Sequence, residues 1–266
     1  MKKGLILTLA AIIMLVAAGC GAKEKSGADG AKVYKFATDA QYPPMESMDK
    51  EDIVGFDIDF LAAVMEEAGL EYEINNLGWE ALLNSVMTGK EYDAGISAVT
   101  INDERKQSYD FSIPYFESTN MILVPEGSDV KNALDLKDKK VAVQISTTAD
   151  ELMKGIMGES NTNLKKFESN ALAMLELANK GVDAVVADIA IVQEYIKNNP
   201  NEKFVHIIDR ENFASEYYGI AFPKGSELKA KLDPAIKTVL ESDKYKEIYK
   251  KWIGGEPDMT GVLSAQ

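Results

Sequence analysis

Residues 93–105 read Asp-Ala-Gly-Ile-Ser-Ala-Val-Thr-Ile-Asn-Asp-Glu-Arg, a short apolar segment followed by hydroxyl side chains and an arginine. We predict a strand at residues 93–96. Ser97 and Thr100 follow this strand, and Arg105 comes five residues after Thr100. Because ligands bind beyond the carboxyl ends of the strands in open α/β sheets, this stretch predicts an α/β fold and one wall of a binding cleft.

The segments before this stretch alternate between strand and helix. Apolar residues at helical spacing, followed in each case by a glycine, predict helices at Phe56–Ala68 and Trp79–Thr88. Strands are predicted at Val33–Thr38 and at residues 72–74. This alternation is typical of a sheet with parallel strand pairs.

A second α/β series follows, and two extended runs connect it to the first. Its predicted strands are residues 140–144, 165–167 and 182–187, and its predicted helices are Thr148–Met157, residues 170–180 and residues 188–197. Thr148 and Glu151 fit a capping box. The extended runs, Asn120–Pro125 and residues 217–222, would suit a hinge between two lobes. Residues 226–252 predict two helices that pack back on the first lobe.

Composition limits the classes of function. The chain has 266 residues, 46% of them hydrophobic, which is enough for one large or two small globular domains. Its formal net charge of -14 argues against nucleic-acid binding. The single cysteine, Cys20, and the single histidine, His206, rule out an internal disulfide and argue against a metal centre. We expect no cofactor, and we expect His206 to be structural.

The N-terminal segment has the features of a targeting signal. Two lysines precede an apolar run at residues 4–18, which is too short for a membrane span and typical of a secretory signal. The run ends in Ala-Ala-Gly-Cys at residues 17–20, which resembles a bacterial lipobox. We therefore predict a signal peptide at residues 1–19, and a lipid-modified Cys20 with a flexible tether at residues 20–32. The alternative is ordinary secretion with an incidental cysteine.

Polar side chains follow the other predicted strands at the same edge. They are Thr38, Asp39 and Tyr42 in the first series, and Ser146, Thr147, Thr148 and Asp188 in the second. Arg105 can hold a carboxylate through two charge-assisted hydrogen bonds, and the helix start at Thr147 and Thr148 attracts anions. Asp188 can accept from an ammonium group. A carboxylate clamp that faces an ammonium clamp is what an α-amino acid requires.

Five stretches together resemble one known family. They are Val-Gly-Phe-Asp-Ile-Asp (54–59), residues 93–105, Asp-Phe-Ser-Ile-Pro-Tyr (110–115), Val-Ala-Val-Gln-Ile-Ser-Thr-Thr (141–148) and Val-Asp-Ala-Val-Val-Ala-Asp (182–188). In this order the chain resembles the family 3 solute-binding proteins of polar amino-acid ABC importers over nearly all of residues 33–254. The resemblance implies a periplasmic-binding-protein type II fold, with two lobes of mixed, mainly parallel sheet flanked by helices and a two-strand hinge. Lobe 1 would be residues 33–121 plus 220–266, and lobe 2 residues 122–219.

The resemblance also implies a role for each site residue. Arg105, with the amides of Thr100 and Thr148, would hold the ligand carboxylate. Asp188, the Ala98 carbonyl and the Thr100 hydroxyl would hold its ammonium group. The predicted ligand-binding residues are Asp39, Tyr42, Trp79, Ser97, Ala98, Thr100, Arg105, Gln144, Thr148 and Asp188.

Other implied positions concern the ligand side chain. Tyr42 and Trp79 match the pair that sandwiches the ligand in this family, and Asp39, Glu46 and Gln144 lie where side-chain specificity is set. Asp39 and Glu46 lean toward a cationic ligand.

One position departs from the family. Gly is usual where Ser146 stands, so a positive backbone angle there would strain Ser146. Ordinary structural interpretations also exist, in which Arg105 is a surface arginine, Asp188 a helix N-cap, Trp79 a core residue and Glu46 a solvated loop charge.

The function expected from these features is capture of a free amino acid outside the cell membrane by a monomeric, lipid-anchored receptor. The receptor would deliver the amino acid to a permease, with a separate ATPase chain. Arginine, lysine, ornithine or histidine is favoured, glutamine comes next, and cystine stays open. Two alternatives are an enzyme on the same fold that resembles cyclohexadienyl dehydratase, and an amino-acid-sensing lipoprotein without transport.

Overall fold

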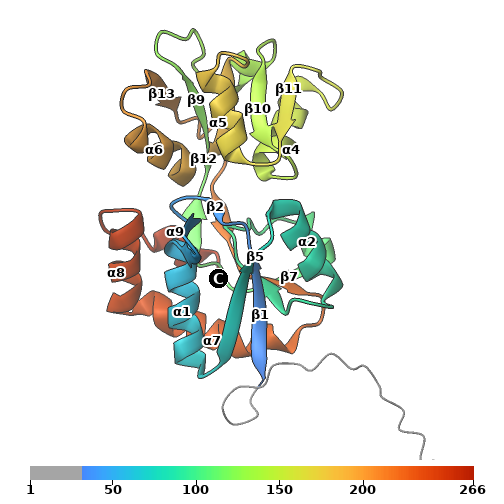
Figure 1. Cartoon of the computed structure of the whole chain (residues 1–266), viewed down its shortest axis with the longest axis vertical. Helices are drawn as coiled ribbons and strands as arrows, with labels where there is room; N and C mark the ends of the chain where they lie inside the picture. The colour runs from blue at the N-terminus through green and yellow to red at the C-terminus, as the bar shows by residue number, and fades with distance from the viewer. Residues whose placement is uncertain (1–31) are drawn as a thin grey trace, which may run out of the picture.

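The computed structural model describes residues 32–266, which form two α/β lobes (Figure 1). The first lobe contains a five-stranded sheet. In spatial order its strands are β5 (Glu71–Asn76), β1 (Val33–Thr38), β6 (Ala94–Gly95), β15 (Ala221–Pro223) and β7 (Tyr109–Phe111). β1 runs parallel to β5 and β6, whereas β15 runs antiparallel to β6 and β7. Of these five strands β15 alone runs against the others, and it makes the sheet mixed.

Helices cover both faces of this sheet. They are α1 (Phe56–Ala68), α2 (Trp79–Thr88), α3 (Arg105–Ser108), α7 (Glu227–Glu241), α8 (Asp243–Trp252) and α9 (Thr260–Ser264). Successive side chains of a strand point to opposite faces. Phe36 of β1 accordingly packs in the cluster that contains α1 and α7, while Ala37 packs in the cluster that contains α2. The C-terminal helices thus complete the first lobe, as the sequence predicts.

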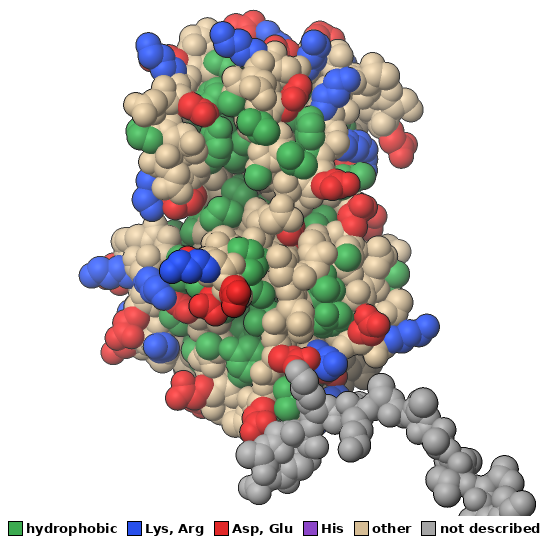
Figure 2. Space-filling model, viewed as in Figure 1, with side chains coloured by type: hydrophobic (Ala, Val, Ile, Leu, Met, Phe, Trp, Pro, Cys, Tyr) green, Lys and Arg blue, Asp and Glu red, His purple; other side chains and the backbone are tan. Residues whose placement is uncertain are grey.

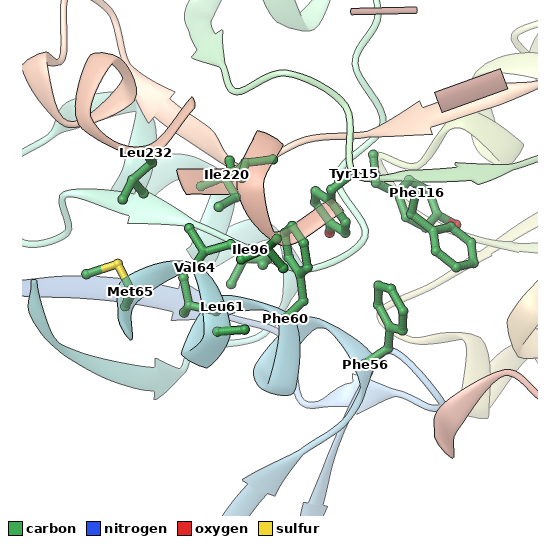
Figure 3. Close-up of a cluster of buried hydrophobic side chains, with 14 of the residues drawn as sticks. Phe56, Phe60, Leu61, Val64, Met65, Ile96, Tyr115, Phe116, Ile220 and Leu232 are labelled. Carbon is green, nitrogen blue, oxygen red and sulfur yellow. The ribbon is translucent and has the colours of Figure 1, made fainter. Parts of the chain in front are cut away.

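Aromatic rings fill the larger core of the first lobe. The ring of Phe60 stacks on that of Tyr115 at 4.7 Å between centroids, and the ring of Phe56 meets that of Phe116 edge-on at 5.1 Å. Figure 3 shows these rings packed together with Leu61 and other apolar side chains of α1. The apolar residues of α1 lie at helical spacing, so one face of the helix is buried in this core.

The second lobe repeats the architecture. Its strands, in spatial order, are β11 (Leu164–Phe167), β10 (Val141–Gln144), β12 (Ala184–Asp188), β9 (Asn120–Pro125) and β13 (Phe204–Ile207). Its helices are α4 (Thr148–Met157), α5 (Asn170–Ala178), α6 (Ile189–Asn198) and a 3-10 turn, η1 (Ala133–Leu136). β10 is parallel to β11 and β12, and β9 is antiparallel to β12 and β13. His206, predicted to be structural, is exposed on the edge strand β13.

Two crossings of the chain connect the lobes. β8 (Phe116–Ser118) and β14 (Glu216–Tyr218) lie there as an antiparallel pair (Figure 1). The predicted arrangement of two α/β lobes and a two-strand hinge is therefore present, and the predicted lobe boundaries remain proposals. A three-stranded sheet of β2 (Gln41–Tyr42), β3 (Glu46–Asp49) and β4 (Asp52–Val54) follows β1 and was not predicted.

Two local predictions are corrected by the structure. Thr147, not Thr148, is the N-cap of α4, because its hydroxyl accepts from the Asp150 amide at 3.3 Å. The predicted hinge runs are also corrected. Residues 217–222 divide between β14, which pairs with β8, and β15, which joins the first sheet, and Asn120–Pro125 is strand β9 of the second sheet rather than a crossing.

The predicted signal peptide and Cys20 lie outside the described residues. Within residues 32–266, no helix has the length and apolarity that a membrane span requires. On the face that Figure 2 shows, charged side chains are spread over both lobes.

Candidate functional site

One cavity between the lobes is lined by all ten predicted ligand-binding residues. The space between these residues, including solvent at the mouth of the cavity, is about 400 Å³. The structure adds four lining residues that the sequence did not single out as ligand-binding, namely Thr147, Ala149, Asn170 and Ala187. The cavity lies at the carboxyl ends of β1, β6, β10 and β12, where the switch-point rule for α/β sheets places a ligand.

Arg105 is one of the residues that line the cavity. Its side chain is buried, with 8% exposed, and lies over the Trp79 ring at 5.3 Å. Its guanidinium donates to the Thr100 carbonyl at 3.1 Å and to the Ser146 carbonyl at 3.2 Å. Within residues 32–266 no carboxylate forms an ion pair with it, and desolvation lowers the pKa of Arg105. A buried, unpaired guanidinium beside the start of α4 fits a ligand carboxylate.

Asp188, the residue predicted to hold the ammonium group, lines the same cavity and is buried. It stands at the N-cap position of α6, yet its carboxylate makes no capping hydrogen bond. The carboxylate instead accepts from the Tyr218 hydroxyl and lies against the Tyr42 hydroxyl. Burial is the main reason that the pKa of Asp188 is raised. An ammonium group at this position would restore the charge balance of the buried carboxylate.

A second group of lining residues, Asp39, Gln144 and Asn170, carries several acceptor atoms. Gln144 accepts from the Asn170 side-chain amide at 2.7 Å and donates to Asp39 at 3.3 Å, so both ends of its amide are engaged. Burial raises the pKa of Asp39. The Oδ1 atom of Asn170 is buried without a hydrogen-bond donor among residues 32–266. A ligand group with several N–H donors would fit these acceptor atoms.

Two buried carboxyl groups lie beneath the cavity floor. Glu46 is neither a solvated loop charge nor a lining residue, because it is fully buried and accepts from the Ser97 hydroxyl at 2.5 Å. Asp57 accepts from the Ala98 amide at 2.7 Å and from the Tyr115 hydroxyl. Ala98 adopts a left-handed φ of 47°, so Asp57 fixes a strained turn of the cavity wall.

Burial and mutual repulsion govern the ionisation of this pair. Desolvation, followed by the charge of Asp57, holds the pKa of Glu46 well above its usual range. Desolvation raises the pKa of Asp57 to about 6. Glu46 Oε2 has no donor among residues 32–266, and a proton on Glu46 that bridges to Asp57 would satisfy both groups.

Ser146 links the second lobe to the first. Its φ of 61° is the left-handed angle at which the sequence predicted strain. Its carbonyl accepts from the Trp79 indole at 3.0 Å as well as from Arg105, and its amide donates to the buried Asp150 at 3.2 Å. The bonds from Trp79 and Arg105 cross the cleft, whereas the bond to Asp150 stays within the second lobe, so the structure is a form in which the lobes are closed.

Glu216 is a partner of the site that the sequence did not reveal. It accepts from the hydroxyls of Thr100 and Thr148, at 2.7 and 2.9 Å. The one clue in the sequence was that Glu216 comes directly before the extended run predicted at residues 217–222. Nothing in the sequence indicated that this run lies near the predicted ligand-binding residues. Among residues 32–266, no three His, Cys, Asp or Glu side chains are grouped as metal ligands.

The pair beneath the floor predicts a pH dependence of stability. Folding raises the pKa values of the Asp57 and Glu46 carboxyl groups. From about pH 4 to pH 6, and somewhat above it, the folded protein therefore binds more protons than the unfolded chain does. Stability therefore falls as pH rises through this window. We expect a higher unfolding temperature without ligand at pH 5 than at pH 8, measured by circular dichroism.

Glu46→Gln should stabilise the protein at pH 8 and change little at pH 5. A gain of about 1 kcal/mol would raise the unfolding temperature by about 2–4 °C. Glu51→Gln, on an exposed turn, is the matched control. An equal loss of stability in Glu46→Gln at both pH values would contradict the account.

The backbone angle of Ser146 predicts opposite results for two substitutions. Ser146→Gly should keep the turn, since glycine adopts a left-handed φ without strain. Ser146→Val should destabilise the turn by about 1–3 kcal/mol, because a β-branched residue is poorly tolerated there. Urea unfolding of both variants measures the difference. Equal stability of the two would show that the left-handed angle is not required.

Comparison with known proteins identifies the family of this chain. The model of the bacterial extracellular solute-binding proteins, family 3, matches residues 34–255. A probable histidine-binding protein of Neisseria gonorrhoeae is 38% identical over 96% of this chain and 97% of its own length. The arginine-binding extracellular protein ArtP of Bacillus subtilis is 31% identical, with 96% of this chain and all of its own covered.

A solved structure supports the same conclusion. The arginine-, lysine-, histidine-binding protein ArtJ of Geobacillus stearothermophilus is 56% identical, covers 87% of this chain and 100% of its own, and has a TM-score of 0.84. The predicted periplasmic-binding-protein type II fold is thereby confirmed. So is the prediction of a binding protein rather than an enzyme, because the relatives are binding proteins. The chain belongs to the bacterial extracellular solute-binding proteins, family 3.

Proposed function

We propose that this protein captures a free cationic amino acid between its lobes and delivers it to the permease of an ABC importer. The observation that carries the proposal is the set of charged side chains that line the cavity, namely Arg105, Asp188 and Asp39. A cationic amino acid carries one carboxylate, one ammonium group and one side-chain cation. Each of these charges has one oppositely charged partner in the cavity.

The cost of burying charge explains why this match matters. An ion that loses water on closure must gain a partner, because an unpaired buried charge is strongly unfavourable. A neutral amino acid such as glutamine would leave Asp39 buried without a cation. Gln144 is already engaged by Asn170 and Asp39, so it offers little to a competing amide.

The relatives support the same class of ligand. The names of the three proteins described above specify histidine, arginine or lysine. Delivery to a permease follows from the resemblance to importer receptors. We further propose that the receptor is a monomer held on the outer face of the cell membrane by a lipid on Cys20, with residues 21–32 as a tether.

Ligand binding is tested by a thermal-shift screen of residues 33–266 against arginine, lysine, ornithine, histidine, glutamine and cystine. A ligand at about 100 times Kd should add roughly 2.7 kcal/mol of stability. Asp39→Asn should weaken cationic ligands far more than glutamine. Arg105→Ala should weaken all of them by about 30-fold or more, since truncating one partner of a buried charge pair costs about 2–5 kcal/mol.

Arg210→Ala is the matched control, because Arg210 is exposed and is the other arginine of the chain. Stabilisation by neutral amino acids alone would refute the cationic preference. If no amino acid acts even after refolding from denaturant, the proposed function is wrong.

The proposed lipid on Cys20 predicts that the protein is found in the membrane fraction of the cell. Cys20→Ser should move the full-length protein from the membrane fraction to the soluble fraction, because a lipid chain supplies the membrane affinity. Ser26→Ala, in the same segment, should stay with the membrane. Cell fractionation and the intact mass of the mature chain provide the readouts. A wild-type protein that lacks the mass of a lipid would contradict the proposal.

A further inference from the structure

The carboxylate of Glu216 joins three side chains at the hinge. It lies on β14, at the second crossing, and does not line the ligand cavity. Its Oε2 atom accepts from Thr100 at 2.7 Å and from Thr148 at 2.9 Å, and its Oε1 atom accepts from the Asn120 amide at 2.7 Å. Both contacts of Oε2 are to hydroxyl oxygens, so the carboxyl can accept from both threonines when it is ionised and donate to one of them when it is protonated.

These partners come from both lobes. Thr100 belongs to the first lobe, where it forms an antiparallel bridge with Tyr218, the last residue of β14. Thr148 begins α4 of the second lobe, and Asn120 is the first residue of β9. The Asn120 amide also donates to the Thr148 hydroxyl at 3.3 Å. The carboxylate of Glu216 therefore connects Thr100 and Thr148, which line the ligand cavity from opposite lobes.

Several charged and titratable groups face Glu216. The Asp188 carboxylate approaches from the end of β12, the Arg105 guanidinium from α3, the Glu151 carboxylate from α4 and the Tyr42 hydroxyl from β2. Desolvation and then Asp188 raise the pKa of Glu216 to about 7, against the opposing effect of its hydroxyl donors and Arg105. The closed protein thus holds this carboxyl near its midpoint at neutral pH.

Opening of the lobes would change these surroundings. A groove on the far side of Glu216 is lined by residues of both lobes, including Asn102 and Glu151, which approach each other at 3.5 Å. Rotation about the β8–β14 pair would draw Thr148 away from Thr100 and admit water to the carboxylate. A hydrated carboxyl has a lower pKa than a buried one, so the closed form binds the proton more tightly than the open form.

We propose that Glu216 is a positioning residue that ties the two lobes together in the closed form, and that its carboxyl takes up a proton when the lobes close on the ligand. This inference rests on the proposed function, because it describes how the same cavity closes. Lower pH then favours closure, and the affinity for ligand rises as pH falls. Glu216 acts through Thr100 and Thr148 and does not itself contact the ligand.

Calorimetric titration with arginine between pH 5.5 and 7.5 tests the proposal, since arginine keeps its charges over this range. The wild-type affinity should rise as pH falls, by at most about tenfold per pH unit, the limit for one proton. Glu216→Gln mimics the protonated carboxyl. It should bind at pH 7.5 as tightly as the wild type at pH 5.5, with a smaller pH slope and less proton uptake when buffers of different ionisation enthalpy are compared.

Two further variants separate the roles of Glu216. Glu216→Ala removes the link between the lobes and should weaken binding by about tenfold or more at every pH. Glu211→Gln, exposed and five residues earlier, should keep the wild-type slope. Because Asp39, Asp188 and the pair beneath the floor remain in every variant, the difference between wild type and Glu216→Gln isolates one carboxyl.

The outcomes are distinct. A wild-type slope in Glu216→Gln, or wild-type affinity in Glu216→Ala, overturns this inference while leaving the proposed function intact. Failure of the wild type to bind any amino acid overturns both. If Glu216→Ala does not fold, the comparison of slopes between Glu216→Gln and the wild type decides alone.

Discussion

The closed structure depends on the hydrogen bonds that the buried guanidinium of Arg105 makes to both lobes. The guanidinium donates to a carbonyl of the first lobe at Thr100 and to a carbonyl of the second at Ser146, with the Trp79 ring beneath it. Carbonyl groups share the charge but do not neutralise it. A guanidinium withdrawn from water in this way creates a strong demand for an anion. The proposed ligand carboxylate satisfies that demand, so ligand capture and lobe closure become one event.

A second set of buried carboxylates holds the backbone that surrounds this centre. Asp57 fixes the left-handed Ala98, and Asp150, itself neutralised by Lys154 and Lys166, fixes the left-handed Ser146. Both turns carry angles that non-glycine residues rarely adopt, and strain of this kind persists only where the surroundings enforce it. The positions of the cavity walls are therefore set by residues that the ligand does not reach.

The sequence predicts the parts of this molecule that depend on local pattern. The bounds of α1 and α2 were predicted to the residue, because helical spacing ends at Gly69 and Gly89, both with left-handed φ. The short strands β2, β3 and β4 were missed, since two to four residues carry too little periodicity. Glu216 was missed because its hydrogen-bond partners lie 68 to 116 residues away in sequence. Arg105 and Asp188 were predicted from their positions after strands and from the resemblance to a family. That Asn170 lines the cavity became evident only from the packed structure.

The central claim is that both charged ends of the ligand are paired inside the cavity, and calorimetry with three related compounds tests it most directly. Arginine has all three charges, agmatine lacks the carboxylate that faces Arg105, and citrulline lacks the cation that faces Asp39. The account predicts that arginine binds and that each analogue is weaker by about 30-fold or more, since each leaves a buried charge unpaired. Agmatine or citrulline binding as tightly as arginine would contradict it.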